Sequence, residues 1–281
     1  MQLYALDNEQ FIFAQQAQRH KNYCCPECQG NVRVRGGPHR HIHFYHLAAN
    51  SLCNQHKKTL PHLQTQLRLY RLLPGSLLEK PYKGIHRIAD VSWEQQKIVF
   101  EIQCSSISLD EAKARCRDYE KLGLTVVWIL HDNRFNKRRI SHSEAFLRQN
   151  KCYYTNIDSK GQGIIYDQFD IAKNRIKYFW GIPLQVDLSL PFKNQNLQLK
   201  HPIPQALILR LSLNLYFKGD LIDRSLQYSS GTAFQSMLHL EKKWLQPLSL
   251  LSFFQSILKH IKDFYNSALR FALESLANPQ K

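Results

Sequence analysis

Two cysteines three positions apart, in the segment Cys-Pro-Glu-Cys at 25–28, restrict the fold of this chain more than any other feature. Thiolates with this spacing on a tight turn occupy two corners of a tetrahedron around zinc. The other two corners have to come from downstream, where His43, His46 and Cys53 are available. We expect a Cys3His zinc site made of Cys25, Cys28, His46 and Cys53. The alternative takes His43 in place of Cys53.

A zinc site with four protein ligands is structural, because it leaves no position open for water. Cys24 lies beside the motif and competes with Cys25 for the first ligand position. The seven cysteines are an odd number, and the first residues do not have the pattern of a secretory signal. Together these features favour metal binding in a reducing compartment, the cytoplasm, over a disulfide framework.

The net charge indicates the class of partner. Lysine and arginine number 38 against 22 acidic residues, which gives a formal charge of +16. Such an excess favours polyanionic partners, of which nucleic acid is the commonest. The longest apolar stretch, 248–258, contains three serines and a glutamine and is too short to span a bilayer. We therefore expect a DNA-binding protein without a membrane span.

The apolar pattern predicts three regions. Residues 1–56 form a β-rich zinc-binding region, 57–180 an α/β domain, and 181–281 a helical C-terminal region. The α/β domain begins with a helix over 60–73, which Pro74 and Gly75 end. It continues with strands at 84–93 and 97–104, a helix at 108–122 and a strand at 124–130. Four prolines make 181–205 a linker, and an apolar stripe over 254–272 predicts a long C-terminal helix.

Two acids lie on the adjacent strands predicted in the α/β domain. Asp90 belongs to the first strand and Glu101 to the second, where Gln103 shares the face of Glu101 because strand side chains alternate. Carboxylates that meet across a hairpin suit Mg²⁺ or Mn²⁺. Such a metal neutralises phosphate charge and activates water, and Gln103 would position that water or the phosphate. Glu79, before the first predicted strand, is a candidate third acid of the site.

The order of these elements is that of the restriction-endonuclease-like core, PD-(D/E)xK, a mixed sheet between helices. In this chain Glu-x-Gln replaces the Glu-x-Lys of that motif, so its catalytic competence is an open question. The expected activity is metal-dependent hydrolysis of phosphodiester bonds, with Asp90 and Glu101 as metal ligands and Asp90, Glu101 and Gln103 as catalytic residues.

Over residues 25–130 the sequence also resembles a known family, the bacterial competence protein CoiA family. The resemblance rests on CPEC (25–28), HFYH (43–46), Cys53, PHLQTQLRLY (61–70), RIADV (87–91), FEIQCSSIS (100–108), Arg115, Tyr119 and VVWIL (126–130). It implies a nuclease-like fold with an N-terminal zinc-binding region. It also implies a role in DNA uptake, transformation and recombination, with incoming single-stranded DNA as the partner.

The resemblance adds candidate DNA-binding residues. His62 matches a family histidine on the first helix, and Arg115 and Tyr119 share one face of a helix because they are four apart. The family often has lysine where this chain has Gln66. From its charge alone, the run Lys137-Arg138-Arg139 is also expected to contact phosphates.

Two alternatives to an active nuclease remain. The first is a catalytically inactive protein that binds single-stranded DNA with the same fold. The second is an adaptor whose helical tail recruits recombination or DNA-uptake proteins.

Overall fold

The computed structural model describes residues 1–37, 40–50, 53, 55, 58–193, 204–227 and 232–245, together with 258, 261, 262 and 265. The chain divides into two compact units, residues 1–241 and 242–281. The predicted boundaries after residues 56 and 180 both lie inside the first unit and stay predictions.

The N-terminal region is a small antiparallel sheet with the strand order β2-β1-β3-β4-β5. Its strands are β1 (Tyr4–Asp7), β2 (Gln10–Phe13), β3 (Tyr23–Cys24), β4 (Asn31–Gly37) and β5 (Arg40–His46). Its core is small and includes two thiols, Cys25 and Cys53, packed with residues such as Val32 and Phe44. A core of this size depends on an additional cross-link such as a metal.

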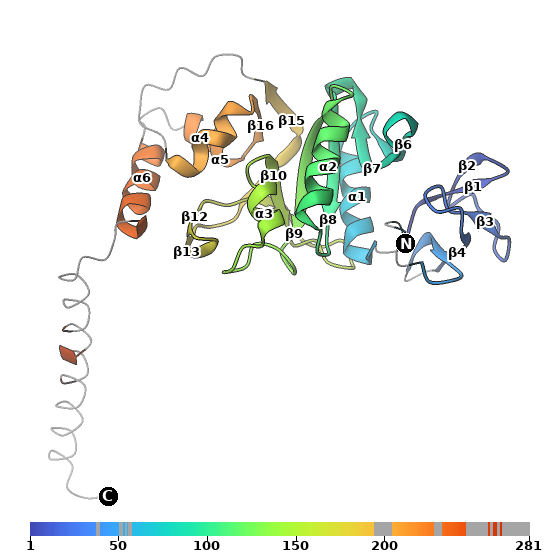
Figure 1. Ribbon diagram of the computed structural model, residues 1–281, viewed down its shortest axis with the longest axis horizontal. Coiled ribbons are helices and arrows are strands. Elements are labelled where there is room, and N and C mark those ends of the chain that lie inside the picture. The colour runs from blue at the N-terminus through green and yellow to red at the C-terminus, as the bar shows by residue number, and fades with distance from the viewer. Residues whose placement is uncertain are drawn as a thin grey trace, which may run out of the picture. The chain divides into compact units, whose positions relative to one another are not determined.

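A seven-stranded sheet with the order β14-β11-β10-β9-β8-β7-β6 forms the centre of the first unit (Figure 1). The strands β8, β9 and β10 are parallel and the other neighbours antiparallel, so the sheet is mixed. The strands are β6 (Leu77–Tyr82), β7 (Arg87–Trp93), β8 (Ile98–Gln103), β9 (Thr125–His131), β10 (Lys151–Thr155), β11 (Ile165–Asp167) and β14 (Leu184–Gln185).

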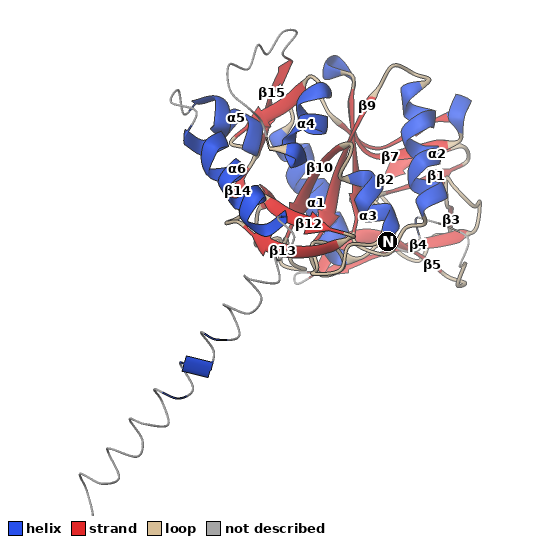
Figure 2. Ribbon diagram, turned by 60° about the vertical axis from the view of Figure 1, so that its left-hand side comes forward, coloured by secondary structure: helices blue, strands red, loops and turns tan. Residues whose placement is uncertain are grey.

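Helices cover both faces of this sheet (Figure 2). The helix α1 (Leu60–Leu72) buries Leu63 and Leu69 in the core on one face. On the other face, α2 (Leu109–Glu120) buries Ala112 and Tyr119. Ser108 begins α2 by accepting a hydrogen bond from the Glu111 amide, as an N-cap does. The fold is therefore a mixed α/β fold in which β8, α2 and β9 form a βαβ unit.

Shorter elements complete the described chain. They are the 3₁₀ helices η2 (Lys83–Ile85) and η3 (Glu94–Gln96), the helices α3 (His142–Leu147), α4 (Gln205–Ser212), α5 (Leu221–Gln227) and α6 (Thr232–Leu245), and the paired strands β12 (Asp170–Lys173) with β13 (Ile176–Trp180) and β15 (Asp187–Lys193) with β16 (Leu215–Lys218). None of the helices described is long and apolar enough to cross a membrane.

The structure corrects two expectations about the chain path. The strand β6 was not predicted, and β7 begins at Arg87 rather than at residue 84. Pro81 argues against a strand, but β6 is the edge of the sheet, where proline is tolerated.

The predicted linker at 181–205 contains β14 and β15. Pro191 of β15 pairs within a two-stranded sheet, in which both strands are edge strands. Of the stripe at 254–272, only residues 258, 261, 262 and 265 are described, and they are helical; the others lie outside the described residues.

Candidate functional site

The predicted first choice of ligands is assembled in the N-terminal region. One ligand atom from each of Cys25, Cys28, His46 and Cys53 lies within 4.8 Å of all the others. The sulfurs of Cys25 and Cys53 are 3.8 Å apart, and Cys28 Sγ lies 3.4 Å from His46 Nε2. A tetrahedral zinc ion with Zn–S bonds of about 2.3 Å requires sulfurs about 3.8 Å apart. The donor set and its spacing therefore fit a structural metal such as zinc.

The two competing ligands point elsewhere. The His43 ring contacts the His41 carbonyl at 2.8 Å and accepts a hydrogen bond from Arg35 at 3.1 Å. Cys24 is the last residue of β3, and Cys25, which follows it, belongs to the cluster. Strand alternation sends adjacent side chains in opposite directions, which is why only one of the two neighbouring cysteines joins the cluster.

Three acids form a row across the strands at one edge of the large sheet. In the antiparallel pairing of β7 with β8, Val91 lies opposite Phe100, which places Asp90 opposite Glu101. In the antiparallel pairing of β6 with β7, Leu78 lies opposite Val91 and Lys80 opposite Ala89, which places Glu79 opposite Asp90. Glu79 has a positive φ of 47°, an uncommon conformation for a residue other than glycine. Three acidic residues are thus neighbours on adjacent strands of the sheet.

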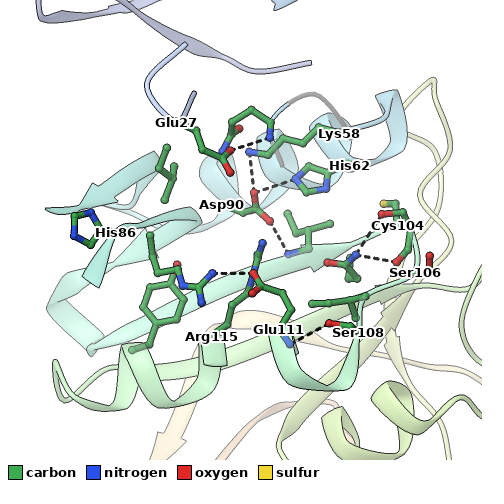
Figure 3. A pocket seen from close by; sticks show the side chains of 18 residues that line it. Glu27, Lys58, His62, His86, Asp90, Cys104, Ser106, Ser108, Glu111 and Arg115 are labelled. Atoms are coloured by element: carbon green, nitrogen blue, oxygen red, sulfur yellow. Dashed lines mark hydrogen bonds and ion pairs between the residues drawn. The ribbon is translucent and has the colours of Figure 1, made fainter. Parts of the chain in front are cut away.

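Asp90 is held from the side of α1 (Figure 3). Its Oδ1 contacts Lys58 Nζ at 2.9 Å and His62 Nε2 at 3.0 Å. Its Oδ2 accepts a hydrogen bond from the Ile102 amide at 2.8 Å, and the Gln66 side chain donates to its carbonyl at 3.0 Å. Lys58 also contacts Glu79 at 2.9 Å, so one ammonium links two carboxylates.

Glu101 is held from α2 instead. Its Oε2 pairs with Arg115 at 2.6 Å, and its Oε1 accepts a hydrogen bond from the Tyr119 hydroxyl at 2.7 Å. Arg115 also pairs with Glu111 at 2.8 Å. The predicted helix face of Arg115 and Tyr119 thus carries the two donors that hold the second acid.

The environments push the pKa values of the two acids apart. Burial acts to raise the pKa of Asp90, but its attraction to His62 and Lys58 outweighs burial and holds that pKa well below its usual range. Burial raises the pKa of Glu101, opposed by Arg115 and reinforced by the negative charge of Asp90. Burial also lowers the pKa of His62, an effect that its attraction to Asp90 opposes. Opposite shifts in two neighbouring carboxyls are typical of sites that handle protons.

These shifts predict unequal effects of two matched substitutions on stability. The lowered pKa of Asp90 contributes stability above the ordinary value of 3.8, and that contribution is lost as pH falls through the folded-state pKa. The raised pKa of Glu101 means that its ionised form costs stability at pH 7. We expect Asp90→Asn to lower the free energy of unfolding at pH 7 by about 3 kcal/mol, because Lys58 loses a buried partner.

For Glu101→Gln we expect the free energy of unfolding at pH 7 to fall by less than about 1 kcal/mol or to rise, because glutamine resembles the protonated acid. Urea unfolding of both variants at pH 7 checks the pair. Equal destabilisation by the two substitutions would contradict the opposite pKa directions.

A pocket of about 370 Å³ opens beside the acid row. Five of the predicted site residues line it: Asp90, His62, Gln103, Arg115 and Tyr119. Glu101 lies behind this lining and is almost fully buried. The N-terminal region contributes Glu27, from the turn between two of the cysteines, so this region and the α/β domain both line the pocket (Figure 3). Lys137, Arg138 and Arg139 are exposed and do not line it.

The carboxylates suit a hard divalent ion chemically, yet they are already engaged. All four oxygens of Asp90 and Glu101 have protein donors. Among the described residues, the Cys3His cluster is the one place where three or more histidine, cysteine or acidic ligand atoms gather. A divalent ion at Asp90 would therefore have to replace Lys58 or His62 as a partner, and the acid row does not form a ready-made metal cage.

Lys58 and Glu79 complete the site. Lys58 was not predicted, because it lies two residues before α1 in a segment without a pattern. Glu79 was considered only as a third acid. Its spacing is informative in retrospect, because Glu79, Asp90 and Glu101 are each eleven residues apart on consecutive antiparallel strands.

In this mixed α/β domain, acids from adjacent strands meet basic side chains from the flanking helices beside one pocket. Acids and basic groups arranged in this way are typical of nuclease-like domains. Comparison with protein families agrees: residues 58–179 match the model described as Competence protein CoiA, nuclease-like domain. Over this segment the chain is similar to the competence protein CoiA family. Comparisons with curated proteins and with solved structures gave no match.

Proposed function

We propose that this chain processes incoming DNA during bacterial transformation by hydrolysing phosphodiester bonds in the pocket beside Asp90. The supporting observation is a buried acid row that meets the basic groups Lys58, His62 and Arg115 at one pocket. Basic groups of this kind attract a phosphate, and paired carboxylates serve metal-assisted hydrolysis. The restriction-endonuclease-like architecture and action in the cytoplasm belong to the same proposal.

The residues have separate roles in this proposal. Arg115 counters the negative charge of the phosphate, and together with Tyr119 it orients Glu101. Asp90 and Glu101 are the side chains that would hold Mg²⁺ or Mn²⁺. When bound there, such an ion would neutralise phosphate charge and lower the pKa of the attacking water. Holding it requires Asp90 to exchange at least one of its present partners.

Single-stranded DNA binding without cleavage is the second candidate function. Two observations favour it: every oxygen of Asp90 and Glu101 already has a protein donor, and Gln103 replaces the lysine of the usual motif. The adaptor hypothesis depends on the C-terminal tail, most of which lies outside the described residues.

A cleavage assay separates the two candidates. The purified zinc-loaded protein is incubated with end-labelled single-stranded and duplex DNA in Mg²⁺, in Mn²⁺ and in EDTA. We expect cleavage of single strands that depends on the divalent ion and stops in EDTA. Tight binding with no product in either ion would overturn hydrolysis and support the binding function.

The affinity for DNA is expected to depend steeply on salt. The chain carries a formal charge of +16, and each phosphate contact releases a counterion. We expect the affinity for a single-stranded oligonucleotide to fall by at least about 100-fold between about 50 and 200 mM salt. Fluorescence anisotropy measures this dependence. An affinity that stays constant across this range would argue against DNA as the partner.

A further inference from the structure

The side chain of Gln103 is turned toward the loop that follows it. Its Nε2 donates to the Ser105 carbonyl at 2.8 Å and contacts Ser105 Oγ at 3.3 Å. An amide in this position also carries no charge. The strand motif therefore brings two acids and no cation to the pocket, and a phosphate there needs positive charge from elsewhere.

The ammonium of Lys58 lies next to the same acids. Its Nζ is 2.9 Å from Asp90 Oδ1 and 2.9 Å from Glu79 Oε1, and its side chain is 6% exposed. Although buried, Lys58 lines the pocket (Figure 3). An ammonium has three donor hydrogens, so two carboxylates leave one for a ligand.

The partners of Lys58 are themselves fixed. Glu79 Oε2 accepts hydrogen bonds from the amides of Leu3 at 2.8 Å and Tyr4 at 3.0 Å, which leaves Oε1 for the lysine. Leu3 and Tyr4 belong to the N-terminal region that also carries the cysteine cluster. This arrangement holds the ammonium at one place beside Asp90, and a group held in place stabilises a reacting charge without reorganising.

We propose that Lys58 contacts the DNA phosphate in this pocket and takes the place of the lysine that the strand motif lacks. The inference rests on the proposed function and adds a catalytic residue to it. In the hydrolysis, the water oxygen bonds to phosphorus, the bond from phosphorus to the leaving sugar oxygen breaks, and a proton from water ends on that oxygen. Lys58 stays protonated and stabilises the phosphate charge throughout.

The test compares Lys58→Met with Lys80→Met, a control in which a partly exposed lysine on β6 loses its pair with Glu94. We expect Lys58→Met to lower the cleavage rate by about 100-fold, as removal of one charge-stabilising donor does. It should also reduce the slope of log affinity against log salt by about one, the loss of one phosphate contact. Lys80→Met should change neither quantity.

The double variant Lys58→Met/Gln103→Lys provides a rescue. Gln103 lines the same pocket, so a lysine there should raise the cleavage rate again by about 10-fold and restore the salt slope. A merely structural role of Lys58 would give no rescue from position 103. If Lys58→Met fails to fold, Lys58→Met/Glu79→Gln removes the ammonium together with a partner carboxylate and leaves less uncompensated charge.

Folding is verified by circular dichroism and zinc content. A folded variant without Lys58 that keeps both the wild-type cleavage rate and the wild-type salt slope would overturn the proposal. A wild type that binds DNA and never cuts it would overturn hydrolysis alone. In that case the salt slope and its rescue decide whether Lys58 contacts the phosphate.

Discussion

Replacing Cys28 with serine is expected to abolish zinc binding and to unfold the N-terminal sheet. Three ligands remain, and a serine hydroxyl is a poor substitute for a thiolate. Two of the ligands, Cys25 and Cys53, are part of the small core of this region, so the metal and the core depend on each other. Structural zinc contributes about 10–16 kcal/mol in small zinc-binding peptides, more than a core of this size supplies.

Metal analysis and limited proteolysis measure the result. The wild type should contain one zinc per chain and resist cleavage within residues 1–53, whereas Cys28→Ser should contain none and be cleaved there. Cys24→Ser is the matched control, because Cys24 is the neighbouring thiol outside the cluster. One full equivalent of zinc in Cys28→Ser would contradict the assignment of Cys28 as a zinc ligand.

Replacing Glu101 with glutamine is expected to abolish cleavage while DNA binding persists. The substitution keeps the size of the side chain and one acceptor oxygen for Arg115 or Tyr119, but it removes the negative charge beside Asp90. Loss of a charge that supports metal-assisted hydrolysis costs about 1,000-fold or more in rate. Affinity for DNA should change little, because Glu101 lies behind the pocket lining and carries no positive charge.

Glu94→Gln is the control for this prediction. Glu94 is an exposed acid on η3 that pairs with Lys80, outside the pocket. Single-turnover cleavage of labelled DNA and anisotropy binding are measured on the same samples. Cleavage by Glu101→Gln at the wild-type rate would exclude the acid row as the catalytic site. A parallel loss of DNA binding would mean that the substitution disturbs the pocket rather than the chemistry.

The sequence predicted the parts of the site that follow from local spacing. The Cys-x-x-Cys pair and the downstream His46 and Cys53 could be selected because few ligands were available, and the structure brings the same four together. The helices α1 and α2 and the strands β7 to β9 were also predicted, since their apolar periods and end signals are local properties of the chain. The strand β6 was missed because Pro81 is compatible with a strand only at a sheet edge, and edges are decided by the whole sheet.

The two central acids were predicted, but their surroundings were not. Strand alternation and hairpin order suggested that Asp90 and Glu101 meet, and the register of β7 with β8 places them opposite each other. Their division between two helices, with Asp90 held from α1 and Glu101 from α2, has no counterpart in the spacing of residues. The opposite pKa directions follow from that division, because burial and partner charges are properties of the packed fold.

The sequence by itself determined which side chains can serve as metal ligands and acids, since these depend on residue type and on distances of a few positions along the chain. Only the tertiary structure decided which groups neutralise them. Lys58 reaches Glu79 and Asp90 across 21 and 32 residues of chain, and Arg115 reaches Glu101 across 14. The physical reason is that charge pairing acts through space at a few ångströms. A local sequence pattern does not indicate which distant segments the packed core brings within that range.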